Sequence, residues 1–313
     1  MPQMRLFGFL AFALACAGAD LRLGIIGTDT SHVTAFTKIL NDNASPDHVE
    51  GARVVAFYKG GSKDVESSYT RVDKYAEELK TVWKIAQMPD ISSLCRNVDA
   101  VLLESVDGRA HLEQARAVIA AKKPLFIDKP LASTLEDARE IAQLAKAANV
   151  PWFSSSSLRF GEIGTQMKYP DITGAITWGP GPFEPHHQLE LSWYAIHPIE
   201  LLFTLMGTGV VEVTRTTTEN MDEVTGRWKD GRIGTVRALR PYGDFGAVVF
   251  RPKTVAQSPA KAAAGYRPLL VEIIKFFQTG KAPVSNEETL EIFAFMDAAQ
   301  RSKADGGKPM KLR

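Results

Sequence analysis

Short apolar runs alternate with stretches of helical periodicity over residues 20–153, and this alternation limits the fold more than any other feature of the chain. The runs predict strands at Leu21–Ile26, Ala52–Tyr58, Ala100–Glu104, Pro124–Ile127 and Pro151–Phe153. Helices are predicted between them at His32–Leu40, Val72–Lys84, Ala110–Ala121 and Leu135–Ala148. Continuous apolar strands separated by helices are typical of a parallel sheet covered on both faces. We therefore predict an α/β domain over residues 20–153, built on a doubly wound parallel sheet.

The pattern changes after residue 153, where β-branched residues and hairpin turns become frequent. Strands are predicted at Ile172–Trp178, Val210–Thr218, Thr225–Leu239 (broken by the turn Lys229-Asp230-Gly231) and Ala247–Phe250. Helices are predicted at Trp193–Met206, Tyr266–Gln278 and Glu287–Ser302. Strands joined by hairpins and flanked by helices indicate an α+β domain over residues 154–313 with a mostly antiparallel sheet. We expect this domain to contact the substrate and, through its sheet, to offer a face for homo-oligomerisation.

Residues 1–19 have the pattern of a secretory signal peptide. Arg5 precedes the apolar run Leu6–Cys16, and Ala17-Gly18-Ala19 fits the A-x-A cleavage rule. The apolar run is too short to span a bilayer, so we expect export through a Sec-type signal and no membrane span in the mature chain. If the segment is not a signal, we expect the protein to be cytoplasmic. Attachment of a lipid to Cys16 is left open.

Charge and cysteine content exclude two other classes. Lys and Arg number 37 and Asp and Glu 36, which gives a net charge of +1. Without a basic excess to neutralise phosphates, we expect no nucleic-acid partner. The chain has 2 cysteines, Cys16 and Cys95, which excludes a disulfide scaffold.

A strand, a glycine turn and a helix start follow one another at residues 23–32, which is the arrangement that binds dinucleotides. In the fingerprint G-x-G-x-x-G, Gly27 holds the first glycine position, whereas Asp29 and His32 hold the second and third. Backbone N–H groups at such a turn favour a pyrophosphate. The candidate cofactor contacts are Gly27, Thr28, Asp29, Thr30, Ser31 and His32. An ordinary turn capped by Asp29 or Thr30 is the alternative.

The second predicted strand ends without the carboxylate that usually binds the ribose hydroxyls of NAD. It continues instead as Lys59-Gly60-Gly61-Ser62-Lys63. Lys59 and Ser62 are candidate contacts to a 2′-phosphate, which favours NADP slightly over NAD. A solvated loop is the alternative for these side chains.

Several motifs in order resemble the Gfo/Idh/MocA oxidoreductase family over nearly all of residues 20–313. Asp128-Lys129-Pro130 after an apolar strand looks like the family's Glu-Lys-Pro motif, with Asp128 in the place of Glu. The stretch from His197 to Gly207 resembles its histidine helix, and residues 229–235 resemble a hairpin of its sheet. The resemblance implies a Rossmann-like first domain, NAD or NADP as cofactor, a small carbohydrate-like substrate, and cofactor contacts at His111 and Asp128.

The same resemblance implies catalytic roles. Lys129 matches the family's lysine and His197 its histidine, which together surround the carbon that exchanges hydride. Trp193 stands where the family has an aspartate four residues before the histidine. Glu200, one helical turn after His197, is the candidate replacement and the third catalytic residue, and Glu190 is another candidate.

Other functions remain open at this stage. His186, His187, Glu190 and His197 are residue types that bind metals, but their spacing does not favour a metal site and we expect none. The altered glycine turn and the expected export also fit a carbohydrate-binding protein that kept the fold and lost redox chemistry. An enzyme with bound cofactor and no net redox change is a third possibility. A serine hydrolase is disfavoured because no G-x-S-x-G motif is present.

Overall fold

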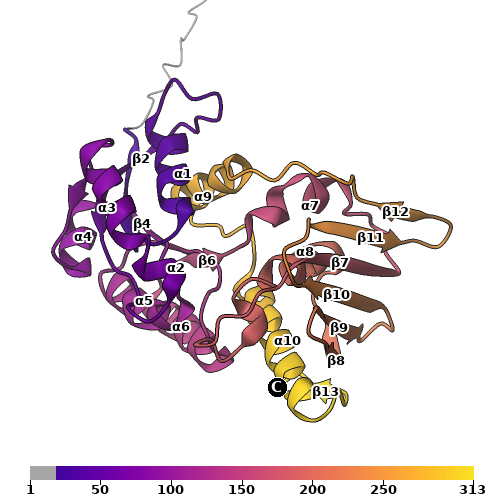
Figure 1. The fold of residues 1–313 in the computed structure, drawn as a ribbon. Helices are drawn as coiled ribbons and strands as arrows, with labels where there is room; N and C mark the ends of the chain where they lie inside the picture. Colours follow the sequence, from indigo (N-terminus) through magenta and orange to yellow (C-terminus); the bar gives the residue numbers. More distant parts are fainter. Residues whose placement is uncertain (1–18) are drawn as a thin grey trace, which may run out of the picture.

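The computed structural model describes residues 19–313 and contains two sheets with helices packed around and between them (Figure 1). Of the proposed signal peptide, residues 1–19, all but Ala19 lies outside the described residues. Within residues 19–313 no helix is long and apolar enough to cross a membrane.

The first sheet is parallel and has six strands in the order β3-β2-β1-β4-β5-β6. The strands are β1 (Leu21–Ile26), β2 (Ala52–Tyr58), β3 (Ala86–Gln87), β4 (Ala100–Leu103), β5 (Leu125–Ile127) and β6 (Trp152–Ser154). The sequence order reverses between β1 and β4, which makes their C-terminal ends the switch point of a doubly wound sheet. This confirms the predicted Rossmann-like domain.

Helices cover both faces of this sheet. The elements on one side are α1 (Ser31–Asn41) and α3 (Val72–Thr81), preceded by the short α2 (Glu66–Tyr69). The other side is covered by α4 (Ile91–Asn97), α5 (His111–Ala120) and α6 (Leu135–Ala148). Helix α9 (Arg267–Thr279) joins the first side, because its apolar residues pack into the same core as α1 (Figure 1). The chain after residue 154 therefore also contributes one helix to the domain built on the first sheet.

The second sheet has seven strands in the order β12-β11-β7-β10-β9-β8-β13. Within the described part of this sheet, the β7–β10 pair is parallel and all other pairs are antiparallel. The strands are β7 (Gly174–Pro180), β8 (Val210–Thr217), β9 (Met221–Trp228), β10 (Ile233–Leu239), β11 (Gly246–Phe250), β12 (Val255–Gln257) and β13 (Met310–Lys311). Helices α8 (Ile196–Met206) and α10 (Asn286–Ala304) pack on one face. The short α7 (Glu162–Gln166) precedes β7. The predicted mostly antiparallel second sheet is confirmed.

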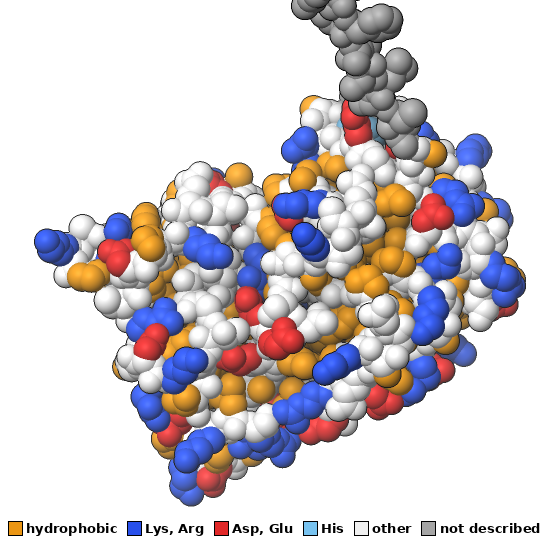
Figure 2. All heavy atoms as spheres, turned by 180° about the vertical axis from the view of Figure 1, so that it is seen from behind, with side chains coloured by type: hydrophobic (Ala, Val, Ile, Leu, Met, Phe, Trp, Pro, Cys, Tyr) orange, Lys and Arg blue, Asp and Glu red, His pale blue; other side chains and the backbone are white. Residues whose placement is uncertain are grey.

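The near balance of charge is visible on the surface. On the face shown in Figure 2, acidic and basic side chains are interspersed with apolar ones. This face therefore has no broad region of a single sign of charge.

Candidate active site

A cavity of about 560 Å³ lies between the C-terminal edge of the parallel sheet and the start of α8. Its wall includes Thr30, Ser31 and His32 after β1, Lys129 after β5, and Trp193, Tyr194 and His197 at the start of α8. Open α/β sheets bind ligands at this edge, beside the switch point. Residues far apart in the sequence thus meet in one candidate active site.

Lys129 reaches this cavity with its ammonium group unpaired. No carboxylate of residues 19–313 lies within 4.0 Å of its Nζ, which instead lies 5.5 Å from the centre of the Tyr194 ring. Burial lowers the pKa of Lys129, while the charges of Asp128 and Glu104 oppose that shift. The ammonium is therefore free to attract a negatively charged oxygen in the cavity.

Among residues 19–313, the imidazole of His197 has one hydrogen-bond partner. Its Nδ1 lies 2.7 Å from Oγ of Ser156, and its ring packs edge-on against Tyr194 and Phe245. Burial, followed by the charge of Lys129, holds the pKa of His197 well below its ordinary value. The imidazole is therefore neutral at neutral pH, which is the form that accepts a proton.

Glu200 does not contact His197 directly. Its carboxylate accepts hydrogen bonds from Ser155 Oγ (2.6 Å), Ser156 N (2.7 Å) and Arg159 Nε (2.9 Å). The same Ser156 holds the imidazole of His197. Glu200 thus positions His197 through Ser156 rather than exchanging a proton with it.

Trp193, at the position where the resemblance implies an aspartate, forms part of the cavity wall. Its ring lies edge-on to His187 at 4.9 Å between centres. Its place gives the cavity an apolar surface, on which a sugar ring can pack.

The glycine turn after β1 is tightly closed around Gly27. Gly27 has a φ of 89°, and a Cβ there would lie 2.5 Å from the backbone nitrogen of Ser105. Thr28 Oγ1 donates to the carbonyls of Lys59 (3.0 Å) and Val72 (2.9 Å). Asp29 is fully buried, and its carboxylate accepts from Ser68 Oγ (2.6 Å) and Val106 N (3.1 Å). The side-chain oxygens of Thr28 and Asp29 are therefore hydrogen-bonded to other parts of the protein.

Residues 65–72, which we call the α2 segment, lie against this turn. Beyond the bonds to Thr28 and Asp29, Ser68 Oγ accepts from Ser62 N at 2.7 Å. A Cβ on Gly61 would lie 2.8 Å from the Val72 side chain. The α2 segment therefore occupies the space between the ends of β1 and β2.

These contacts decide how well a dinucleotide fits. Thr30 and Ser31 line the cavity at the N-terminus of α1, where a pyrophosphate is favoured. Arg71, at the end of the α2 segment, lines the same cavity. The residues therefore fit the phosphate side of NAD or NADP, and the α2 segment narrows the space beside the ends of β1 and β2, where the adenosine side would lie.

Lys59, Ser62 and His111, three further candidate cofactor contacts, have internal partners. Lys59 forms an ion pair with Asp73, and Ser62 Oγ donates to Asp107 at 2.6 Å. Both ring nitrogens of His111 face backbone carbonyls, those of Leu131 and Ser105. None of the three lines the cavity, so they give no basis for preferring NADP over NAD.

The four residues considered as metal ligands do not meet. Glu190 binds Arg215 and Lys303, and His187 lies 3.1 Å from Asp107. His186 pairs with Glu184 at the surface, and His197 with Ser156. The structure therefore separates these candidates into four different environments.

His32 and Asp128, two of the predicted cofactor contacts, form a buried pair under the cavity wall. His32 Nδ1 is 2.6 Å from Asp128 Oδ2, and Glu104 lies beside them with its Oε2 4.0 Å from the same nitrogen. Sequence reasoning missed Glu104. The available signal is its place directly after the apolar strand β4, because side chains at that point face the ligand-binding edge.

Asp107 ties the loop after β4 to its surroundings. It accepts hydrogen bonds from Ser62, Arg109 and His187, and it is 1 % exposed. Burial acts to raise the pKa of Asp107, but these hydrogen bonds outweigh it and hold the pKa far below the ordinary value.

We expect Asp107→Asn to lower the free energy of unfolding by about 3 kcal/mol at pH 7, because Arg109 and His187 lose their buried anion. A depressed pKa stabilises the fold above the ordinary carboxyl pKa, and this contribution is lost progressively as the pH falls from about 4 toward the depressed pKa. Denaturant titrations at pH 7 and at about pH 2 check this, with Asp64→Asn, which removes the exposed partner of Arg109, as the control. A difference between Asp107→Asn and wild type that stays constant with pH would contradict it.

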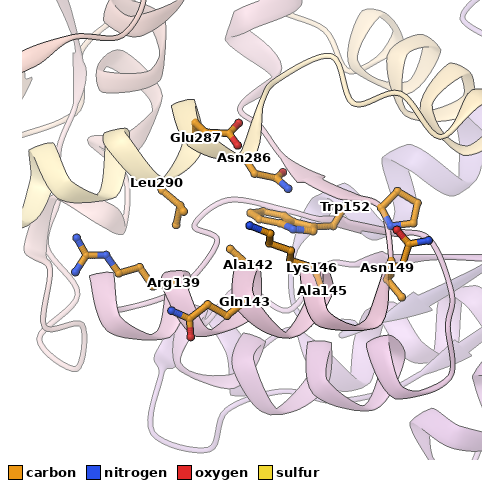
Figure 3. Close-up of a pocket in the computed structure, with 12 residues that line it drawn as sticks. Arg139, Ala142, Gln143, Ala145, Lys146, Asn149, Trp152, Asn286, Glu287 and Leu290 are labelled. Atoms are coloured by element: carbon orange, nitrogen blue, oxygen red, sulfur yellow. The ribbon is translucent and has the colours of Figure 1, made fainter.

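A second cavity, of about 790 Å³, lies elsewhere, between α6 and the start of α10 (Figure 3). Its wall includes Trp152, Lys146 and Asn286 and none of the residues discussed above. The candidate active site is therefore the cavity at the sheet edge.

Comparison with known proteins identifies the type of the first domain. Residues 21–155 match the family model described as "Oxidoreductase family, NAD-binding Rossmann fold". The chain is 30% identical to an inositol 2-dehydrogenase of Paracoccus denitrificans over 163 residues, which cover 50% of this chain and 43% of that protein. It is 44% identical to a 1,5-anhydro-D-fructose reductase of Ensifer adhaerens over 110 residues, 35% of this chain and 31% of that protein. The matches thus span less than half the length of these relatives.

Solved structures extend the likeness over the whole fold. The myo-inositol dehydrogenase of Lactobacillus casei, solved in complex with NAD(H) and myo-inositol, superposes with a TM-score of 0.72 at 18% identity. The superposition covers 94% of this chain and 97% of that one. Residues 21–155 therefore belong, as an NAD-binding Rossmann domain, to the Gfo/Idh/MocA oxidoreductase family, and the solved structures show the same fold over the rest of the chain.

Proposed function

We propose that this protein uses NAD or NADP to oxidise a hydroxyl, or to reduce a carbonyl, of a small carbohydrate-like molecule. The observation that carries the proposal is the meeting of Lys129 and His197 around Tyr194 in one cavity at the switch edge of the sheet. Family membership supports redox chemistry, and the named activities of the two relatives support a polyol or sugar substrate.

The two side chains suit the proton part of the reaction. An alcohol that loses hydride from carbon must also lose a proton from oxygen, and the bound nicotinamide cofactor supplies or takes up the hydride. Neutral His197 is suited to accept the proton, and the Lys129 ammonium to stabilise the oxygen while it carries negative charge. Glu200 and Ser156 keep the imidazole in place.

The test is a spectrophotometric assay for formation or consumption of NADH and NADPH with a panel that includes myo-inositol and 1,5-anhydro-D-fructose. We expect turnover with at least one polyol or sugar carbonyl and one cofactor. Product formation without net change in NADH or NADPH would instead indicate that the cofactor is re-reduced within each cycle.

A second candidate function is carbohydrate binding without redox chemistry. The α2 segment favours it, because this segment binds Thr28 and Asp29 and so narrows the space for an adenosine group. The expected signal peptide favours it as well, since an exported protein meets little free cofactor. Calorimetry that shows sugar binding, together with the absence of any nucleotide binding, would select this function over the first.

A further inference from the structure

Three side chains beneath the cavity wall place metal-binding atoms close together. One nitrogen of His32 and one oxygen each of Glu104 and Asp128 all lie within 4.8 Å of one another. They come from three neighbouring points of the switch edge: the start of α1, the end of β4 and the end of β5. The two strand ends and the helix start hold them in place independently of any loop closure.

The carboxylates of this cluster are buried without enough donors. Glu104 is 0 % and Asp128 3 % exposed. Within the described residues, neither oxygen of Glu104 has a hydrogen-bond partner, and neither does Oδ1 of Asp128. Buried carboxylates elsewhere in the molecule, such as Asp29 and Glu200, have donors at both oxygens. Native proteins rarely leave such groups unsatisfied, so the three oxygens point to a ligand that the protein chain itself does not provide.

The charge of Lys129 acts on both carboxylates, but its ammonium does not donate a hydrogen bond to either. Lys129 follows Asp128 in sequence, yet its Nζ lies more than 4.0 Å from every carboxylate oxygen of residues 19–313 and turns toward Tyr194. The ammonium of Lys129 therefore faces the cavity, whereas the carboxylates of Glu104 and Asp128 face His32.

We propose that His32, Glu104 and Asp128 bind a divalent transition-metal ion at the inner wall of the cavity. One imidazole and two carboxylates suit Zn²⁺ or Mn²⁺, and two negative charges balance the ion in this buried place. Three protein ligands leave coordination positions open, as in catalytic rather than structural metal sites.

The site lies where such open positions are useful. His32 itself lines the cavity beside Lys129, whereas Glu104 and Asp128 lie behind it, so an ion bound to its Nδ1 lies one side chain behind the cavity wall. Water, or an oxygen of a cavity ligand that reaches past His32, completes the coordination.

The experiment uses the full chain after treatment with a chelator, and adds Zn²⁺, Mn²⁺ or Mg²⁺ alone. We expect about one Zn²⁺ or Mn²⁺ per chain after gel filtration, measured by elemental analysis, together with a rise in the thermal midpoint that saturates with the ion. Glu104→Gln and Asp128→Asn are each expected to weaken binding by more than about 100-fold. In the metal-free state Glu104→Gln is expected to be at least as stable as wild type, because it removes a buried unpaired carboxylate, so loss of binding is not loss of the fold.

The matched control is Glu184→Gln, which alters an exposed cluster of similar composition: His186 lies 2.6 Å from Glu184 and 3.8 Å from Asp64. This variant is expected to bind the ion like wild type. Wild-type protein that retains none of the three ions, or Glu104→Gln that binds as tightly as wild type, would overturn the site. Metal content and thermal stability do not depend on redox turnover, so the result stands apart from the proposed function.

Discussion

Lys129→Ala is expected to lower turnover by roughly 10²–10³-fold while leaving nucleotide affinity nearly unchanged. The ammonium has no ion-pair partner among the described residues and faces the cavity, so its main interaction is with the charge that develops on the substrate oxygen. Removing it leaves that charge without its cation. Steady-state kinetics and a separate nucleotide titration measure the two effects.

Lys59→Ala is the matched control for this substitution. Lys59 is a half-exposed lysine of the same sheet edge that pairs with Asp73 and does not line the cavity. Its loss is expected to leave turnover unchanged. Equal rates for Lys129→Ala and wild type would remove Lys129 from the mechanism.

The largest effect on stability is expected for Arg215→Ala, at about 3–5 kcal/mol. Arg215 is buried and donates to Asp222 (2.8 Å), Glu190 (2.6 Å) and Gln300 (3.1 Å). Asp222 is itself fully buried, so the substitution deprives a buried carboxylate of one of its two arginines. Glu190 belongs to the turn that leads into α8, so this network also holds the approach to Trp193 and His197.

Arg237→Ala provides the comparison, because Arg237 pairs with Glu223 on the exposed face of the same sheet. Exposed ion pairs contribute little, so this variant is expected to change the free energy of unfolding by less than about 1 kcal/mol. Denaturant titration of both variants measures the difference. Similar losses for the two would show that burial does not set the contribution of these pairs.

Most of the first domain can be predicted from sequence because its elements are strongly patterned. The predicted bounds of β1, β2 and α6 match the structure, since each is an apolar or periodic run between clear breaks. The short α4 and β3 were not predicted, because seven and two residues are too few to show a period. The helix containing His197 starts at Ile196 rather than at Trp193, because a 3₁₀ turn at Glu190–Ser192 precedes it.

Site residues could be predicted where each belongs to a motif that is visible in the sequence by itself. Contacts between residues distant in sequence could not be predicted. Lys129 and His197 follow from their motifs, and the structure brings both to one cavity. Ser68, which donates a hydrogen bond to Asp29, lies 39 residues further along the chain, and no local sequence pattern predicts this contact. Glu104 is marked in the sequence only by its place directly after β4, and its neighbours His32 and Asp128 are distant in sequence.

The central claim is that this chain binds a nicotinamide dinucleotide at the edge where Lys129 and His197 meet. Titration of the purified protein with NADH and with NADPH, followed by the fluorescence of the nucleotide, tests it most directly. We expect saturable binding of at least one of them with a dissociation constant well below about 1 mM. Absence of binding for both nucleotides at millimolar concentration would contradict the claim, and would mean that the α2 segment closes the place of the cofactor for good.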